Sequence, residues 1–104
     1  MYALHPGARD ELEATVRWYE AQAQGLGAEF LSVVQSALQR IVERPALAAA
    51  WTSTRFEAGT VVRRAVLDRF PYLIVYSVEG RAVVVWAIAH GRRSDGYWVD
   101  RVAT

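Results

Sequence analysis

Residues 62–78, VRRAVLDRFPYLIVYSV, and residues 81–101, RAVVVWAIAHGRRSDGYWVDR, decide the fold. Their apolar residues recur with a period of two and include many β-branched and aromatic types, which predicts strands. Turn signals at Phe70-Pro71 and Glu79-Gly80 separate three strands, over residues 61–67, 72–78 and 81–90. Strands joined by such short turns predict an antiparallel meander.

The third strand is apolar on both faces. Simple alternation turns one set of side chains to one face and a second set to the other, namely Val83, Val85, Ala87 and Ala89 against Ala82, Val84, Trp86 and Ile88. A strand of this kind is central and covered on both sides. Because a broad apolar surface is rarely left exposed, we expect helices on one face and the C-terminal tail or a partner on the other.

The first half of the chain predicts a helical hairpin. Over residues 6–24 apolar side chains recur at helical spacing, and Pro6 suits a first turn. Asp10, Glu11 and Glu13 lie near this start, where the helix dipole favours anions. A second helix is predicted from the spacing of Phe30, Val34, Ala37 and Ile41, between the break at Gly25-Leu26-Gly27 and the stop at Pro45. Residues 2–4 can add a short first strand.

Composition bounds the kind of partner. All twelve basic residues are arginine, with four against six carboxylates in residues 1–50 and eight against five in residues 51–104. Guanidinium groups bind carboxylates and phosphates in a bidentate way, so the second half suits an acidic or nucleic-acid partner. An Arg-favouring codon usage explains the missing lysines equally well. There is no cysteine, signal peptide or apolar run of the ~20 residues that a membrane span needs, so we expect a cytoplasmic location and no membrane.

Several kinds of chemistry have no support in the sequence. None of the serines lies in a nucleophile-elbow context, and the glycines fall in turns rather than in a phosphate-binding loop. Only two histidines, His5 and His90, are available for metal binding. The pair Asp10 and Glu13 sits at helical spacing on a solvated face. We therefore expect no cofactor and no metal.

The tail of the meander is the stretch that carries candidate contacts. Residues 90–98, HGRRSDGYW, and then Arg101 combine cations with aromatics, as surfaces that contact nucleic acid or acidic protein do. A second interpretation stays open, in which His90 and Trp98 fold back to cap the sheet and the arginines are merely solvated. Alternation also puts Arg63 and Arg69 on one face of their strand and Arg64 on the other. At least one of these three should be partly buried and paired, with Asp68 or Glu57 as its carboxylate.

The order of these motifs resembles the ParE-like branch of the RelE/ParE toxin superfamily of type II toxin-antitoxin systems. That branch shows an arginine-led strand, an F-P-Y turn (residues 70–72), a strand ending in A-x-x-H-x-x-R (residues 87–93) and a final Y-W-x-x-R (residues 97–101). The first half is similar as well, through Glu11-Leu12, Trp18-Tyr19-Glu20, Gly25-Leu26-Gly27 and Phe30-Leu31. The resemblance covers essentially the whole chain.

The resemblance implies an α+β fold of order β-α-α-β-β-β, with the helical hairpin packed on an antiparallel sheet as one toxin domain over residues 1–104. It also implies a cognate antitoxin whose C-terminal segment wraps the toxin and through which alone the toxin reaches DNA. Covering of the open sheet face by such a partner segment is a known recognition mode.

Two activities occur in the superfamily. RelE-like members cleave mRNA on the ribosome with cations and commonly a tyrosine, whereas ParE-like members bind and poison DNA gyrase. By motif, an arginine of the cleaving set would fall at Leu73, and its lysines have no counterpart in a chain without lysine.

The primary hypothesis is thus a non-catalytic toxin that binds gyrase, with the contact residues Arg92, Arg93, Tyr97, Trp98 and Arg101. The alternative is an mRNA endoribonuclease with a site rebuilt from Arg63, His90, Arg93 and Tyr97, in which His90 serves as general acid or base. A third possibility is a chain that has lost toxicity and acts as a co-repressor with its antitoxin.

Overall fold

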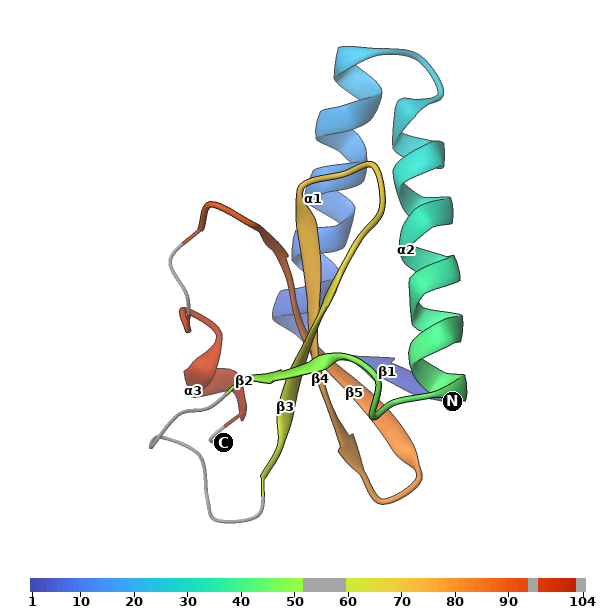
Figure 1. The fold of residues 1–104 in the computed structure, drawn as a ribbon. Coiled ribbons are helices and arrows are strands. Elements are labelled where there is room, and N and C mark those ends of the chain that lie inside the picture. The colour runs from blue at the N-terminus through green and yellow to red at the C-terminus, as the bar shows by residue number, and fades with distance from the viewer. Residues whose placement is uncertain (52–59, 94–95, 103–104) are drawn as a thin grey trace.

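The computed structural model describes residues 1–51, 60–93 and 96–102 (Figure 1). The helical hairpin is confirmed as α1 (Pro6–Gln22) and α2 (Leu26–Glu43). The Glu20 carboxylate closes the turn between them, because it accepts the N–H groups of Gly25 at 2.9 Å and Gly27 at 3.0 Å. A Cβ on Gly27 would lie 2.6 Å from the Val16 carbonyl oxygen, so glycine is what lets the two helices approach this closely.

The sheet contains five strands in the order β1-β5-β4-β3-β2. The three predicted strands are confirmed, with small shifts of their ends, as β3 (Val62–Val66), β4 (Tyr72–Glu79) and β5 (Ala82–His90). The possible first strand is β1 (Tyr2–Leu4), and two short elements that we did not predict are β2 (Ala49–Trp51) and α3 (Val99–Val102).

The expected α+β class and hairpin-on-sheet architecture are confirmed, but the sheet is mixed rather than wholly antiparallel. β1 runs parallel to β5, and the other three pairings are antiparallel. Alternation identifies a strand but not the neighbour or direction with which it pairs, because pairing joins residues that are far apart in the chain. The β1–β5 pair joins residues near opposite ends of this chain.

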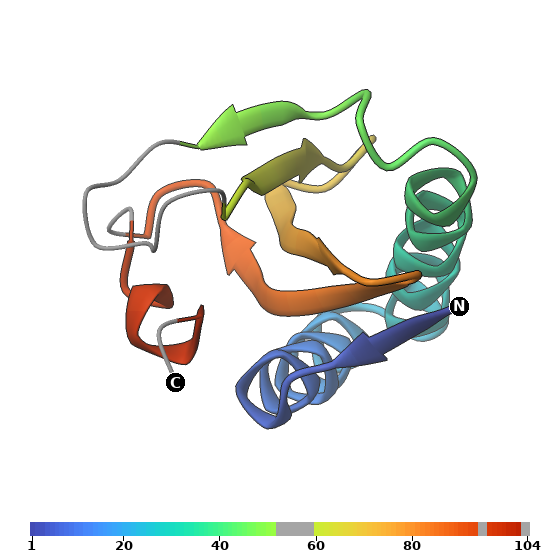
Figure 2. The same ribbon diagram turned by 90° about the horizontal axis from the view of Figure 1, so that it is seen from below.

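Each face of the sheet has its own apolar cluster. On one face α1 and α2 cover Ile74, Tyr76 and Val85, and Phe30 of α2 is fully buried there. On the other face Trp98 and Val99 pack with the buried residues Val62, Val75 and Ala87. Figure 2 shows the helices along one side of the sheet and the C-terminal segment on the opposite side. Of the two covers expected for the second face, the C-terminal tail or a partner, the structure shows the C-terminal tail there.

A bulge in β5 changes which side chains face which cluster. Val75 of β4 pairs with Ala87, but the next residue, Tyr76, pairs with Val85, so Trp86 is the extra residue. As a result Val85 and Ile88 both face the helices, whereas Ala87 belongs to the opposite cluster. The predicted alternation of Val83, Val85, Ala87 and Ala89 on one face is wrong beyond Trp86, because an inserted residue shifts the period by one.

Candidate functional site

β5 is longer than β1, so the backbone groups on the outer edge of β5 beyond β1 need other hydrogen-bond partners. β1 ends with Leu4, and the N–H of His5 makes the last backbone bond to this edge, to the Val85 carbonyl at 2.8 Å. Beyond it the Trp86 carbonyl accepts Arg101 Nη1 at 2.9 Å, and the Ile88 N–H donates to Glu11 Oε1 at 3.0 Å. Two side chains from opposite ends of the chain thus replace a neighbouring strand.

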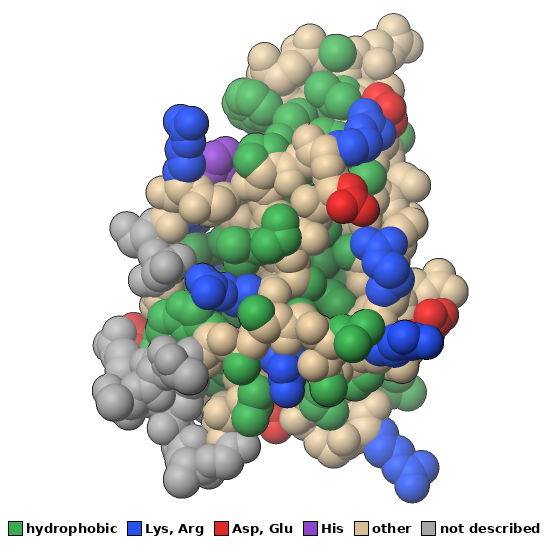
Figure 3. Space-filling view, viewed as in Figure 1, with side chains coloured by type: hydrophobic (Ala, Val, Ile, Leu, Met, Phe, Trp, Pro, Cys, Tyr) green, Lys and Arg blue, Asp and Glu red, His purple; other side chains and the backbone are tan. Residues whose placement is uncertain are grey.

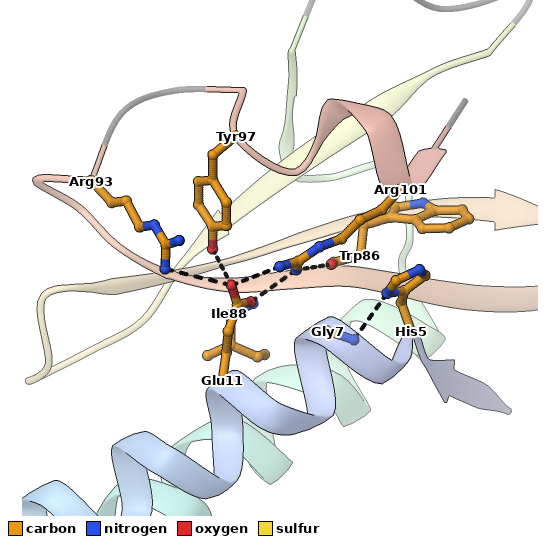
Figure 4. Close-up of polar contacts among 8 residues, drawn as sticks. All are labelled: His5, Gly7, Glu11, Trp86, Ile88, Arg93, Tyr97 and Arg101. Carbon is orange, nitrogen blue, oxygen red and sulfur yellow. Dashed lines mark hydrogen bonds and ion pairs between the residues drawn. The ribbon is translucent and has the colours of Figure 1, made fainter. Parts of the chain in front are cut away.

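Glu11, in α1, is the centre of this arrangement (Figure 4). Besides the Ile88 N–H, its carboxylate accepts the Tyr97 hydroxyl at 2.6 Å and both terminal nitrogens of Arg101 at 3.1 Å. The Arg93 guanidinium lies 3.8 Å away, and only 14% of the Glu11 side chain is exposed. We call Glu11, Arg93, Tyr97 and Arg101 the Glu11 cluster. It ties the C-terminal segment to both α1 and β5.

A glycine makes room for the ion pair. A Cβ on Gly7 would lie 2.6 Å from Arg101 Cζ, which no real side chain tolerates without a shift. Gly7 is also held by His5, the N-cap residue of α1, because the Gly7 N–H donates to His5 Nδ1 at 3.0 Å. The absence of a side chain at Gly7 thus lets the Arg101 guanidinium lie close to the first turn of α1.

Tyr97 is a hydrogen-bond donor that keeps its proton. Burial and then the hydrogen bond to the Glu11 carboxylate raise the pKa of Tyr97 well above its ordinary value, against the opposing effect of the two arginines. The Arg93 Cζ lies over the Tyr97 ring at 3.8 Å from its centroid, a cation–π contact. A phenol in this state does not serve as a general base.

The five residues predicted as target contacts are divided by the structure into exposed and inward-facing ones. Arg92 is exposed and 55% of the Arg93 side chain is exposed. By contrast, Trp98 is only 3% exposed and packs edge-on to Trp51 at 4.8 Å, while Arg101 is held by Glu11. Trp98 folding back onto the sheet is what the second interpretation of this stretch foresaw.

The residues proposed for a nuclease site do not all come together. Arg93 and Tyr97 meet at Glu11, but Arg63 lies on β3, two strands from β5 in the sheet, and donates to the Ala48 carbonyl at 2.8 Å. His90 contacts the ring of Tyr72 at 5.1 Å, and its Nδ1 accepts the Arg92 N–H. Within the described residues, the His90 side chain makes no hydrogen bond to Arg93, Tyr97 or Glu11. Leu73 packs against the apolar cluster on the second face of the sheet, the one formed by Trp98 and Val99 with the strands, and so does Tyr97.

The structure also places the three arginines that lie on or just after β3, the first strand of the predicted meander. Arg63 and Arg64 are half-buried, as expected for at least one of them. Arg69 belongs to the turn after β3, has a φ of 69°, and forms an exposed ion pair with Glu29 at 3.2 Å rather than with Asp68. Glu57, the other predicted carboxylate, lies outside the described residues.

Sequence reasoning missed Glu11, which it assigned to the helix dipole. The available signal was its spacing: Glu11 follows the buried Ala8 by three residues and precedes the buried Thr15 by four, which puts it on the inward face of α1. A carboxylate on such a face needs a partner. Within residues 1–51, 60–93 and 96–102, no three His, Asp or Glu side chains gather to hold a metal ion. No described helix is both long and apolar enough to cross a membrane.

Comparison with known proteins supports the architecture and confirms the ParE-like resemblance that the sequence motifs indicated. The sequence matches the family model described as the ParE toxin of the type II toxin-antitoxin system, parDE, over residues 2–95. A solved structure from the chromosomal ParDE toxin-antitoxin system of P. aeruginosa is similar, with a TM-score of 0.66 and 18% identity over 86% of this chain and 92% of that one. At this identity the solved structure shows the fold alone. No curated protein sequence matches significantly.

Proposed function

We propose a function from the premise that this chain belongs to the ParE toxin family of type II toxin-antitoxin systems. The proposal is that the chain acts without catalysis, by binding a protein target, and that this target is DNA gyrase. A cognate antitoxin neutralises it by binding the toxin.

The Glu11 cluster is the observation that supports binding over catalysis. Cleavage of a phosphodiester needs cations free to stabilise the developing charge and a group free to move a proton. Here the Arg101 fork is used by Glu11 and the Trp86 carbonyl, and the Tyr97 hydroxyl donates to Glu11. These groups hold the C-terminal segment in place, and Leu73 contributes no charge.

The surface proposed for the target is the exposed part of the same segment. Arg92 and Arg93 follow β5 directly, and Arg93 is steadied by its stacking on Tyr97. Exposed guanidinium groups on a fixed support suit carboxylates of a protein partner. Trp98 and Arg101 contribute indirectly to this surface, because they anchor the segment that carries the two arginines.

A supercoiling assay with purified gyrase tests the proposal. The wild-type chain should inhibit supercoiling at micromolar concentration, and Arg92→Ala/Arg93→Ala should need at least about tenfold more protein. The matched control is Arg9→Ala/Arg17→Ala, which removes two exposed arginines from α1 and should leave inhibition unchanged. Folded wild-type protein that has no effect on gyrase but cleaves translated mRNA within codons would refute the proposal.

A further inference from the structure

A pocket outside the Glu11 cluster lies between α1 and the ends of β4 and β5. It has a volume of about 360 Å³, and its lining comprises Trp18, Tyr19, Pro71, Tyr72 and His90. The two strands meet there because Tyr72, the first residue of β4, pairs with His90, the last residue of β5. Four of the five lining residues carry an aromatic ring, so the pocket suits one small ligand with a planar ring system.

The rings of this aromatic pocket form two separate walls. The centroid of the Trp18 ring lies 5.1 Å from that of Tyr19. The Tyr72 ring lies 5.1 Å from the His90 ring, and Tyr19 joins the two pairs through a contact with Tyr72 at 6.2 Å. Among the described residues, Trp18 makes no ring contact with Tyr72 or His90, although all three line the pocket. Because 57% of Trp18 is exposed, its ring offers a surface on which a planar ligand can stack.

Three polar groups of the lining have no protein partner. His90 Nδ1 accepts the Arg92 N–H at 3.0 Å, so in the neutral ring Nε2 carries the proton and is a donor. Neither this Nε2 nor the hydroxyls of Tyr19 and Tyr72 make a hydrogen bond within the part of the chain that the structure describes. An apolar side chain in the pocket would leave all three groups unused. A planar ring that carries its own donors and acceptors can bind them.

The charge beside the aromatic pocket is positive. Arg92, whose N–H is bonded to His90, is exposed and has no ion-pair partner among the described residues. The lining of the pocket contains no carboxylate. Figure 3 shows a histidine side chain in purple at the upper left of the molecule, with an arginine in blue and apolar side chains in green beside it. A guanidinium group in this position suits a phosphate.

We propose that the aromatic pocket binds a nucleotide. The base stacks on the Trp18 ring, its polar edge meets His90 Nε2 and the tyrosine hydroxyls, and its phosphate pairs with Arg92. A free nucleotide and an unpaired nucleotide within a single strand offer this same chemistry, whereas a base inside a duplex does not, because its faces are stacked and its edge is paired. The proposal concerns binding alone and does not depend on the action on gyrase.

A cationic ligand fits the aromatic pocket less well. Rings of tryptophan and tyrosine also bind quaternary ammonium groups, through the negative potential of their faces. Such a ligand would meet the Arg92 guanidinium beside the pocket and no carboxylate in its lining. The positive charge therefore favours an anionic aromatic ligand over a cationic one.

Nucleotide binding by the purified full chain tests this proposal. One probe is a fluorescein-labelled single strand of about ten nucleotides in mixed sequence, as DNA and as RNA, followed by anisotropy. The other is the set of four nucleoside monophosphates, measured by calorimetry. Trp18→Ala should weaken binding at least about tenfold through the loss of one stacking contact. Tyr72→Phe, which keeps the ring and removes one hydroxyl, should weaken it roughly threefold.

Two controls accompany these variants. Tyr2→Ala removes another exposed aromatic ring, 43% exposed and on β1, and should change the affinity less than about twofold. A duplex of the same sequence carries the same kind of phosphate and should bind at least about fivefold more weakly than the single strand. Far-UV circular dichroism checks that Trp18→Ala is folded, and the exposure of Trp18 predicts that it is.

The outcomes separate the ligands and the alternatives. Binding of the monophosphates alone identifies a free nucleotide, binding of the single strand alone identifies an unpaired nucleotide in a strand, and either supports the proposal if Trp18→Ala weakens it. This holds whether or not the wild type inhibits gyrase. A wild-type chain that binds no probe at up to about 1 mM overturns the proposal. So does equal binding by Trp18→Ala, or a duplex that binds as tightly as the single strand. Loss of gyrase inhibition in Trp18→Ala with nucleotide affinity unchanged also overturns it and assigns the pocket to a protein target.

Discussion

On one face of the sheet two long helices bury a continuous apolar core, whereas on the other face the short segment 96–102 covers a smaller one. The helices are held mainly by apolar contact, because their apolar stripes meet many sheet residues, and the bond from the Ile88 N–H to Glu11 is added to that contact. The short segment has only Trp98 and Val99 fully buried, and the Glu11 cluster supplies the rest of its attachment. The comparison teaches that one carboxylate can hold in place what a short apolar segment cannot hold alone.

The largest effect is expected on the helix-covered face. Phe30 is fully buried and meets Tyr19, Phe70 and Tyr72 at ring distances of 5.2, 5.1 and 5.2 Å. Phe30→Ala should lower the free energy of unfolding by about 3–5 kcal/mol through lost burial and the cavity that remains. Urea unfolding followed by far-UV circular dichroism measures it, and a loss under about 1 kcal/mol would show that this face contributes less than its burial indicates.

A smaller but distinct loss is expected for Glu11→Ala. The change leaves the Ile88 N–H, the Tyr97 hydroxyl and the Arg101 guanidinium without their carboxylate. We expect a loss of about 2–4 kcal/mol from groups left unpaired in a mostly buried place. Glu13→Ala, on the exposed side of the same helix, is the control and should cost less than about 0.5 kcal/mol. Equal losses of unfolding free energy for the two variants would show that the contacts of Glu11 do not stabilise the fold as we propose.

The tyrosine of the cluster gives the smallest expected effect and a pH signature. Tyr97→Phe removes one hydrogen bond to a charged acceptor, which should cost about 1–2 kcal/mol near neutral pH. Because the pKa of Tyr97 is higher in the folded chain than the ordinary value, its contribution is complete below about pH 10 and declines as the pH rises above that. The stability difference between wild type and variant should therefore shrink at alkaline pH.

Tyr19 and Tyr76 also have raised pKa values, chiefly through burial, but both proteins contain them. Their titration cancels in the difference between wild type and variant. Urea unfolding at about pH 8 and about pH 10.5 is enough. A difference that stays constant between these two conditions would contradict the placement of the Tyr97 proton.

Much of the helix-covered face could be predicted from the sequence. Periodicity alone places Phe30, Val34 and Ile41 on the inner side of α2, because a helix repeats the same pattern over several turns. It also identified β3, β4 and β5. The parallel pairing of β1 with β5 was not predictable in this way, since it depends on where the chain returns in space.

The second face was predictable only in outline. The need for a cover on β5 followed from its apolar residues, but the bulge at Trp86 has no period of its own and changed the facing of Ala87 and Ile88. The aromatic and arginine residues of the tail were found by composition, which cannot tell an outward Arg93 from an inward Trp98. Their positions depend on Glu11, which is distant in the sequence.

Hydrogen exchange of Glu11→Gln, followed by mass spectrometry, tests most directly the claim that the two faces are held differently. Glutamine keeps the shape of the side chain but not the charge that pairs with Arg101. Amides of residues 96–102 should exchange at least about tenfold faster than in the wild type, while those of α2 and β4 keep their protection. Equal loss of protection in both regions, or none in residues 96–102, would contradict the account.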